Sequence, residues 1–136
     1  MGACLMMRRG ELFDERFFLY CEDTDLCARL LRRGDILYVP EAQFFHELGT
    51  SSKAHRWKAI AMYNSGKELY FRIHHGPVKA SWCWLLDRLG GLLRCLAWFV
   101  VYAMYFGTNW RAKGNMEAFW KVSTAPASYD GLKTRS

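Results

Sequence analysis

A long hydrophobic stretch near the C-terminus constrains the fold of this 136-residue chain more than any other feature. Between Ala80 and Gly107 the sequence is dominated by Leu, Trp, Phe and Tyr, and its leucines recur every three or four residues, which predicts a helix. The uncharged run Cys95–Trp110 has 16 residues. As a helix this run would extend over about 24 Å, less than the ~30 Å hydrocarbon core of a bilayer.

The residues around this stretch favour membrane association. Tryptophans at positions 82, 84, 98 and 110 are distributed like the aromatic anchors found at a bilayer surface. Three placements remain open: a helix lying in the interface, a marginal spanning helix lengthened by Arg94, or a buried helix of a soluble protein. We expect one of the first two, because a chain of this length has little other surface to cover so much aromatic area.

The two parts of the chain carry opposite net charge. Residues 1–50 hold six Arg against nine Asp or Glu, a net of −3, whereas residues 51–136 hold 13 Lys or Arg against four Asp or Glu, a net of +9. The acidic part suits a cation or a sugar, and the basic part suits anionic lipid or nucleic acid. Because the aromatic residues lie among leucines and not among the basic residues, we expect a membrane surface and no nucleic acid.

The five cysteines, at positions 4, 21, 27, 83 and 95, form no CxxC pair. This pattern argues against both a disulfide framework and a zinc ribbon, so we expect reduced thiols in a cytosolic compartment. The run Met1–Met7 is too short for the hydrophobic region of a signal peptide, and its arginines follow it instead of preceding it.

Short apolar runs and helix-like periodicity alternate along the first 77 residues. Three runs predict strands, namely "GACLMMRR" (2–9), "ILYV" (36–39) and "AQFFHEL" (42–48). Two segments predict helices, 25–33 and 53–73, and Gly34 is suited to end the first of them. The polar tail from Thr124 onward is expected to be disordered.

Three acidic residues between an aromatic run and a helix, in "FFLYCEDTDLCARL", leave several interpretations open. Acidic residues in the first turn of a helix complement its dipole. This effect alone explains an acidic residue at position 25. Asp23 lies at the junction itself, where a carboxylate can accept a proton from a sugar hydroxyl, and Glu22 can accept a hydrogen bond from the same acceptor. Asp23 and Asp25 also form the only Asp-x-Asp of the chain, a spacing that can hold a divalent cation but is unspecific.

His46 ends the apolar run "FFHELG" and has two interpretations. A lone histidine in such a place is more often a hydrogen-bonded structural residue than a ligand. At a strand end that faces a cleft, its imidazole can still complete a metal site. Neither His46 nor Asp23 identifies a function alone.

The order of these segments resembles a known family. "GACLMMRR", "FDERFFLYCEDTDLCARLLRRG", "YVPEAQFFHELGTSS", a basic helix and "FRIHHGP" together resemble the C-terminal half of a family 2 glycosyltransferase, with rhamnosyltransferase-like enzymes of bacterial polysaccharide assembly as the nearest likeness. The resemblance covers residues 2 to about 77. It implies an α/β GT-A fold with a Rossmann-like sheet, and inverting transfer of a sugar from a nucleotide diphosphate donor.

The resemblance also implies roles for individual residues. Asp23 matches the family's catalytic base and Glu22 the neighbouring acidic position that helps to hold the acceptor. Gly2, Ala3 and Arg56 match positions that lie near the donor in the family. His46 matches a ligand of the divalent metal ion, such as Mg or Mn.

The family's nucleotide-binding half, with its own metal-binding Asp-x-Asp, has no counterpart in this sequence, and the segment before "FDERFF" is shorter than usual. We therefore expect a fragment truncated at the N-terminus that does not bind a nucleotide sugar tightly alone.

Three regions follow from the resemblance: 1–77 as the C-terminal part of a catalytic domain, 78–123 as a hydrophobic membrane-associated helical region, and 124–136 as a tail. Relatives with hydrophobic C-terminal helices imply the cytoplasmic face of the cell membrane and a saccharide or lipid-linked acceptor. The alternative is a non-catalytic membrane-associated partner of a separate donor-binding half.

Overall fold

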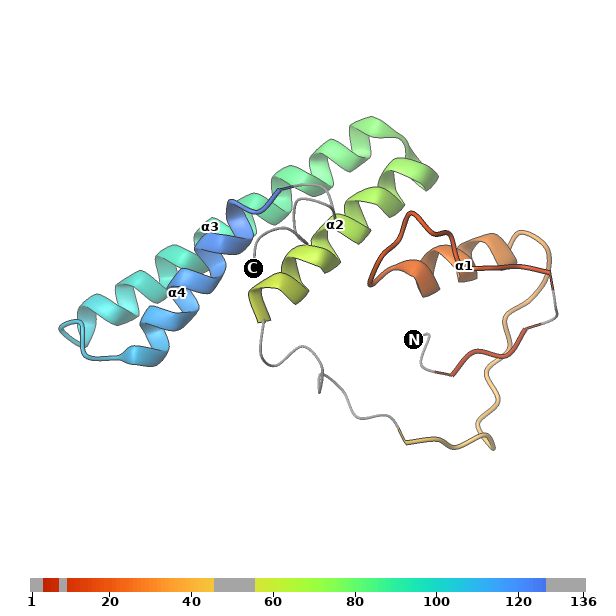
Figure 1. The fold of residues 1–136 in the computed structure, drawn as a ribbon, viewed down its shortest axis with the longest axis horizontal. Helices are drawn as coiled ribbons and strands as arrows, with labels where there is room; N and C mark the ends of the chain where they lie inside the picture. Colours follow the sequence, from red (N-terminus) through yellow and green to blue (C-terminus); the bar gives the residue numbers. More distant parts are fainter. Residues whose placement is uncertain (1–3, 8–9, 46–55, 127–136) are drawn as a thin grey trace.

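Four helices and no strand make up the part of the chain that the computed structural model describes, residues 4–7, 10–45 and 56–126 (Figure 1). In chain order the helices are α1 (Glu22–Leu30), α2 (Arg56–His75), α3 (Pro77–Met104) and α4 (Trp110–Ser123). The predicted α/β class with a partial GT-A sheet is therefore wrong for these residues. The helices predicted at 25–33, 53–73 and 80–107 are found with shifted ends. The helix α4 lies within the helical region expected at 78–123, but a separate helix was not predicted there.

The predicted strands fail because their apolar residues find no partner. All of residues 36–45 are exposed, with Leu37 at 82% and Tyr38 at 88% of full exposure. A preference for strands expresses how well a residue fits a pleated, half-buried surface, so it has no effect where no neighbouring strand pairs with the segment. The described part of the first predicted strand, residues 4–7, is likewise neither strand nor helix. Residues 2, 3, 8, 9 and 46–48 of the predicted strands lie outside the described residues.

A single residue, Gly76, joins α2 to α3. Its φ is 88°, in the left-handed region that glycine adopts without a steric penalty. Pro77 follows as the first residue of α3, where its fixed φ suits the helix and its missing N–H costs nothing. The chain therefore reverses at once, and α2 and α3 lie side by side and antiparallel (Figure 1).

A second tight turn returns the chain onto α3. Phe106 and Gly107 have positive φ values of 51° and 75°, and Asn109 caps α4 by accepting a hydrogen bond from the Ala112 N–H at 3.1 Å. Where α4 meets α3, Gly91 is buried, and a Cβ atom there would overlap the Ser123 side chain. Gly91 therefore allows the two helices to approach closely.

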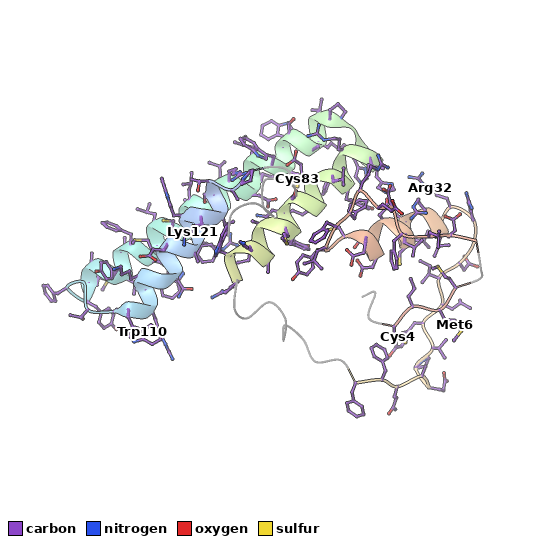
Figure 2. The ribbon with its side chains drawn as sticks, viewed as in Figure 1. Cys4, Met6, Arg32, Cys83, Trp110 and Lys121 are labelled. Carbon is purple, nitrogen blue, oxygen red and sulfur yellow. The ribbon has the colours of Figure 1, made fainter. Side chains whose placement is uncertain are left out.

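The core between these helices is made mostly of small residues. Its buried apolar side chains are few, and four of them are alanines, at positions 61, 80, 112 and 125. The large apolar side chains of α3 instead stand out from the side that faces away from α2 and α4 (Figure 2). Among the described helices we find none with the length and the hydropathy that crossing a membrane requires.

Candidate functional site

A strained turn precedes α1 and presents its acidic residues. Tyr20 and Cys21 are consecutive non-glycine residues in the left-handed region, with φ values of 69° and 67°. Each such residue costs roughly 1–2 kcal/mol, and Cys21 offers no side-chain cap in return. Strained backbone of this kind is concentrated at functional sites, so the turn draws attention to Glu22 and Asp23, which directly follow it.

Asp23 is the second residue of α1 and is half-buried. Its Oδ1 accepts hydrogen bonds from the Thr24 N–H at 2.8 Å and from the Thr24 hydroxyl at 3.3 Å. The helix N-terminus favours a negative charge at this place. The sequence placed Asp23 at the junction between an aromatic run and a helix, and the structure shows that the run ends in a turn before α1.

Glu22 has a carboxylate oxygen whose hydrogen-bonding capacity is unused within the described residues. Its Oε2 is buried and accepts no hydrogen bond from them. Buried polar atoms in native proteins are almost always paired, so an unpaired one requires an explanation. A hydroxyl donor from outside the described residues would supply the missing partner.

Asp25 has different surroundings, although it is only two residues from Asp23. It is 1% exposed, and its two oxygens bind different partners: His74 Nε2 at 2.8 Å and Arg29 Nε at 2.9 Å. Asp25 therefore lies in the first turn of α1, as predicted, but it also fastens α1 to α2. A cation shared with Asp23 would compete with both of these bonds.

His74 is a buried residue that the sequence analysis did not identify. Its Nδ1 lies 3.0 Å from Arg32 Nη2. Because a guanidinium can only donate, Nδ1 is the acceptor, so Nε2 carries the hydrogen and donates it to Asp25. The ring also packs on Tyr70, with 4.5 Å between centroids. Nothing in the local pattern around "FRIHHGP" shows that this histidine meets a residue 49 positions earlier.

The loop before α1 is also fastened to the helix. Arg29 donates to Glu11 Oε2 and to the Leu12 carbonyl oxygen, both at 2.8 Å, and Arg33 pairs with the other oxygen of Glu11. These bonds hold residues 11 and 12 against α1. The acidic turn is thus anchored on both sides, by this loop and by α2.

The pKa of the Cys21 thiol reflects the burial and the negative charge of the strained turn. Burial, together with the nearby carboxylates of Asp23 and Glu22, raises the pKa of its thiol from 9.0 to about 11. The positive charge of Lys67 on α2 lowers the pKa of the Cys21 thiol and so offsets part of this rise. Lys67 in turn binds Asp87 of α3 at 2.6 Å, so the acidic turn faces a region where α2 and α3 meet.

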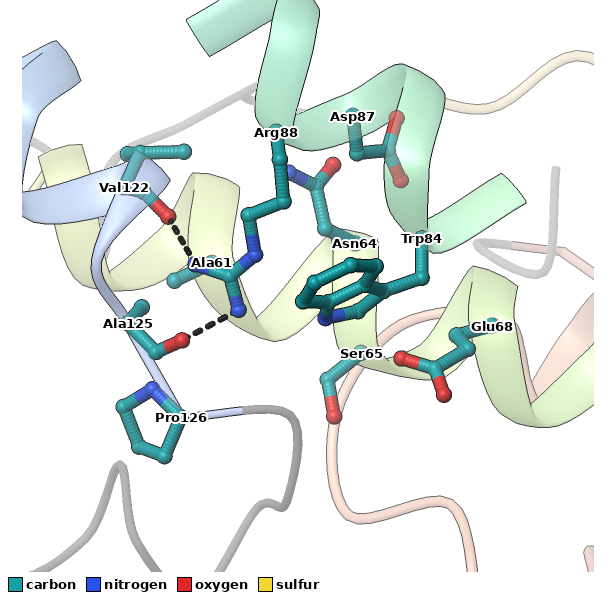
Figure 3. Close-up of a pocket in the computed structure, with 10 residues that line it drawn as sticks. All are labelled: Ala61, Asn64, Ser65, Glu68, Trp84, Asp87, Arg88, Val122, Ala125 and Pro126. Atoms are coloured by element: carbon teal, nitrogen blue, oxygen red, sulfur yellow. Dashed lines mark hydrogen bonds between the residues drawn. The ribbon is translucent and has the colours of Figure 1, made fainter. Parts of the chain in front are cut away.

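A separate small pocket lies between α2, α3 and the end of α4 (Figure 3). Its enclosed space of about 20 Å³ is enough for a water molecule but not for a sugar. Arg88 donates to the carbonyl oxygens of Val122, at 3.0 Å, Ser123 and Ala125, and stacks 5.4 Å from the Trp84 ring. The guanidinium thus binds the carbonyls at the C-terminus of α4, and we assign the pocket a structural role.

Of the remaining predicted site residues, Arg56 is within the described structure. Arg56, at the start of α2, donates to Asn115 Oδ1 of α4 at 3.1 Å. Gly2, Ala3 and His46 lie outside the described residues. Within those residues, no group of three or more His, Cys, Asp or Glu side chains could hold a metal ion. The predicted divalent metal stays a prediction, because its expected ligand His46 is not among the described residues.

Comparison with known proteins gives a partial match. No protein-family model matches the chain, and no solved structure does. The chain is 35% identical over 106 residues to N-acetylglucosaminyl-diphospho-decaprenol L-rhamnosyltransferase of Mycobacterium tuberculosis, in strains CDC 1551 / Oshkosh and ATCC 25618 / H37Rv. The match covers 71% of this chain and 29% of the relative, so the chain spans less than a third of that protein. It shows a distant relation to a glycosyltransferase.

Proposed function

We propose that this chain contributes the acceptor side of a sugar-transfer site in which Asp23 is the general base. The observation that carries the proposal is the 35% identity to a rhamnosyltransferase. Two structural features support it: the strained turn at Tyr20 and Cys21, and the buried Glu22 oxygen without a partner among the described residues. Both adjoin Asp23 in the sequence.

In the proposed step, an acceptor hydroxyl attacks the anomeric carbon of a sugar bound to a nucleotide diphosphate. The new bond joins the acceptor oxygen to that carbon, the bond to the diphosphate oxygen breaks, and the diphosphate leaves with the electron pair. Asp23 takes the hydroxyl proton as the oxygen attacks, which makes that oxygen a better nucleophile. Attack opposite the leaving group inverts the anomeric carbon.

Glu22 would orient the acceptor for this attack. A second hydroxyl of the acceptor sugar would donate to Glu22 Oε2, the buried oxygen described above. Holding the attacking oxygen in place in this way lowers the entropy cost of the reaction. Asp25 has no part in the step, because both of its oxygens are engaged with His74 and Arg29.

The name of the relative suggests the substrate class. That enzyme is named for transferring L-rhamnose to N-acetylglucosaminyl-diphospho-decaprenol. We propose by analogy a lipid-linked sugar diphosphate as the acceptor and the membrane surface at the cytoplasmic face as the place of reaction. The donor contacts of Gly2, Ala3 and Arg56, and the metal contact of His46, stay predictions.

The test uses a chimera, because the chain spans only part of the relative. In the chimera, this chain replaces the corresponding part of the mycobacterial rhamnosyltransferase. We expect Asp23→Asn to lower kcat by about 10²–10⁴-fold, with donor binding unchanged, because the amide cannot accept the proton. The matched control is Asp35→Asn, which changes an exposed acid outside the helices and should leave kcat unaltered. If the Asp23→Asn chimera transferred sugar at the parental rate, Asp23 would not be the base.

A further inference from the structure

The outward face of α3 is more apolar than the face it buries. Its fully buried residues are small, Ala80 and Gly91, and Asp87 is among those that face the other helices. Its exposed residues include the polar or charged Lys79, Ser81 and Arg94. Most of the others are large and apolar, including eleven that recur along the helix: Val78, Trp82, Leu85, Leu86, Leu89, Leu92, Leu93, Leu96, Phe99, Val100 and Met104. A helix of a water-soluble domain has the opposite arrangement.

These large apolar residues form one continuous stripe, which we call the outer stripe of α3. Their positions recur at intervals of three and four from Val78 to Met104, so they share one side of the helix. At 1.5 Å per residue the stripe is about 40 Å long. None of its members is charged. A stripe of this length exceeds the isolated apolar residues that occur normally on protein surfaces.

No other described element covers the outer stripe. The helices α2, α3 and α4 all contact one another, so α2 and α4 share one side of α3 (Figure 1). The exposed fraction of the stripe residues ranges from 38% at Leu85 to 72% at Met104, and it is 62% and 67% at Leu86 and Leu93. The apolar surface continues past the end of α3 into Phe106 and Trp110, which are also exposed.

The charges around the stripe indicate which partner covers it. Residues 56–126 contain ten Lys or Arg and only three Asp or Glu. Two of these three acids are already paired, Glu68 with Arg72 and Asp87 with Lys67. On α3 itself, the exposed charged side chains are Lys79 and Arg94, and both are basic. The surroundings are therefore cationic, so the complementary partner combines an apolar surface with negative charge.

We propose that the outer stripe of α3 lies in the surface of an anionic lipid bilayer, with the helix axis parallel to the membrane plane. No described helix can cross a membrane, which agrees with an in-plane position. An uncharged stripe bordered by tryptophans and flanked by basic residues is the pattern of interfacial helices. A second copy of the chain would fit less well, because it would bring two basic surfaces together.

The test measures binding of the whole chain to vesicles of equal parts phosphatidylcholine and phosphatidylglycerol. Leu86→Glu with Leu93→Glu places two charges in the stripe, and we expect it to weaken vesicle binding at least about tenfold. The matched control is Leu12→Glu with Leu37→Glu, which adds the same charge at two leucines that are 81% and 82% exposed outside α3. It should stay within about twofold of the parent. Circular dichroism checks that all variants keep their helices.

Three outcomes would overturn the proposal. The parent chain could fail to bind the vesicles, or the two double variants could bind equally, or vesicles of phosphatidylcholine alone could bind as well as the anionic ones. If the parent bound no vesicles and formed a dimer that Leu86→Glu with Leu93→Glu dissociated, the stripe would be an interface between copies. No sugar transfer enters these measurements, so the proposal stands or fails independently of the proposed function.

Discussion

Asp23 and Asp25 have the same side chain and nearly the same place in α1, yet their surroundings differ. Asp25 is buried between His74 and Arg29, whereas Asp23 is half-buried and hydrogen-bonded within its own turn. The sequence could place both in the first turn of a helix, because that depends on local pattern. It could not distinguish them by burial, because the partner that buries Asp25 comes from a helix 49 residues later.

At the same scale, the raised pKa of Cys21 predicts an unreactive thiol. Thiolates are the nucleophiles, and a pKa of about 11 in place of 9.0 leaves roughly a hundredfold less thiolate at pH 8. We therefore expect iodoacetamide to label exposed Cys4 rapidly and Cys21 at least about a hundredfold more slowly. Mass spectrometry of the labelled peptides measures both rates. Labelling in urea is the control, and equal rates in the folded chain would contradict the prediction.

Among the elements, α1 depends on α2 for its position. The described contacts between them include the bond from His74 to Asp25, which is buried at both ends. We expect His74→Ala to lower the free energy of unfolding by about 2–3 kcal/mol, because it removes a buried hydrogen bond to a charged group. Urea unfolding measures this loss, and hydrogen exchange should show α1 opening first.

The neighbouring histidine provides the control for this prediction. His75 lies on the same helix but is exposed, and its contacts are with the rings of Tyr70 and Phe71. His75→Ala should therefore change the free energy of unfolding by about 0.5 kcal/mol or less. Equal losses in the two variants would show that the link to Asp25 does not hold α1 in place.

The contact between α3 and α4 can be tested with two glycines. A Cβ atom at Gly91 would overlap the Ser123 hydroxyl and displace it from its hydrogen bond to the Phe119 carbonyl oxygen. This loss outweighs the better helix propensity of alanine, so Gly91→Ala should destabilise the protein by about 0.5–1 kcal/mol. At Gly114, within α4, a Cβ atom would meet nothing within 4 Å, so Gly114→Ala should stabilise it by about 0.5–1 kcal/mol. Thermal unfolding followed by circular dichroism gives both values. A shift of the same sign in both variants would rule out close packing at Gly91.

How well the elements could be predicted depended on whether their signal is local. The periodic leucines of α3 and the apolar face of α2 repeat within each helix, so the sequence located both. The run "ILYV" has the composition of a strand, but a strand also needs a neighbour to pair with, and the described residues provide none. The start of α4 as a separate helix could not be predicted inside the helical region 78–123, because only the Asn109 cap marks it.

For the molecule as a whole, the helical part should resist proteolysis better than the segment before it. Tyr38 and Phe45 are exposed outside any helix, whereas Phe99 is exposed within α3. A protease needs an extended backbone, so cleavage in α3 requires local unfolding. We expect brief chymotrypsin treatment to cut after Tyr38 and Phe45 well before Phe99, as mass spectrometry can establish. Early cleavage at Phe99 would mean that α3 is not a stable helix.

The candidate site was predicted less completely than the helices. The resemblance to a glycosyltransferase selected Asp23 and Glu22, and the partial match to a rhamnosyltransferase agrees with that relation. The left-handed backbone at Tyr20 and Cys21 has no sequence signal, because neither residue type favours it. The buried state of Glu22 Oε2 likewise depends on packing from other elements, which a single sequence does not specify.

The one-residue connection at Gly76 couples the position of α3 to the end of α2. Any rotation or tilt of α3 that Gly76 does not absorb must turn the end of α2, and His74 lies only two residues before this connection. Through the bond to Asp25, the same motion displaces the first turn of α1, where Asp23 is placed. The outer stripe of α3 is thus connected to the first turn of α1 through Gly76, His74 and Asp25.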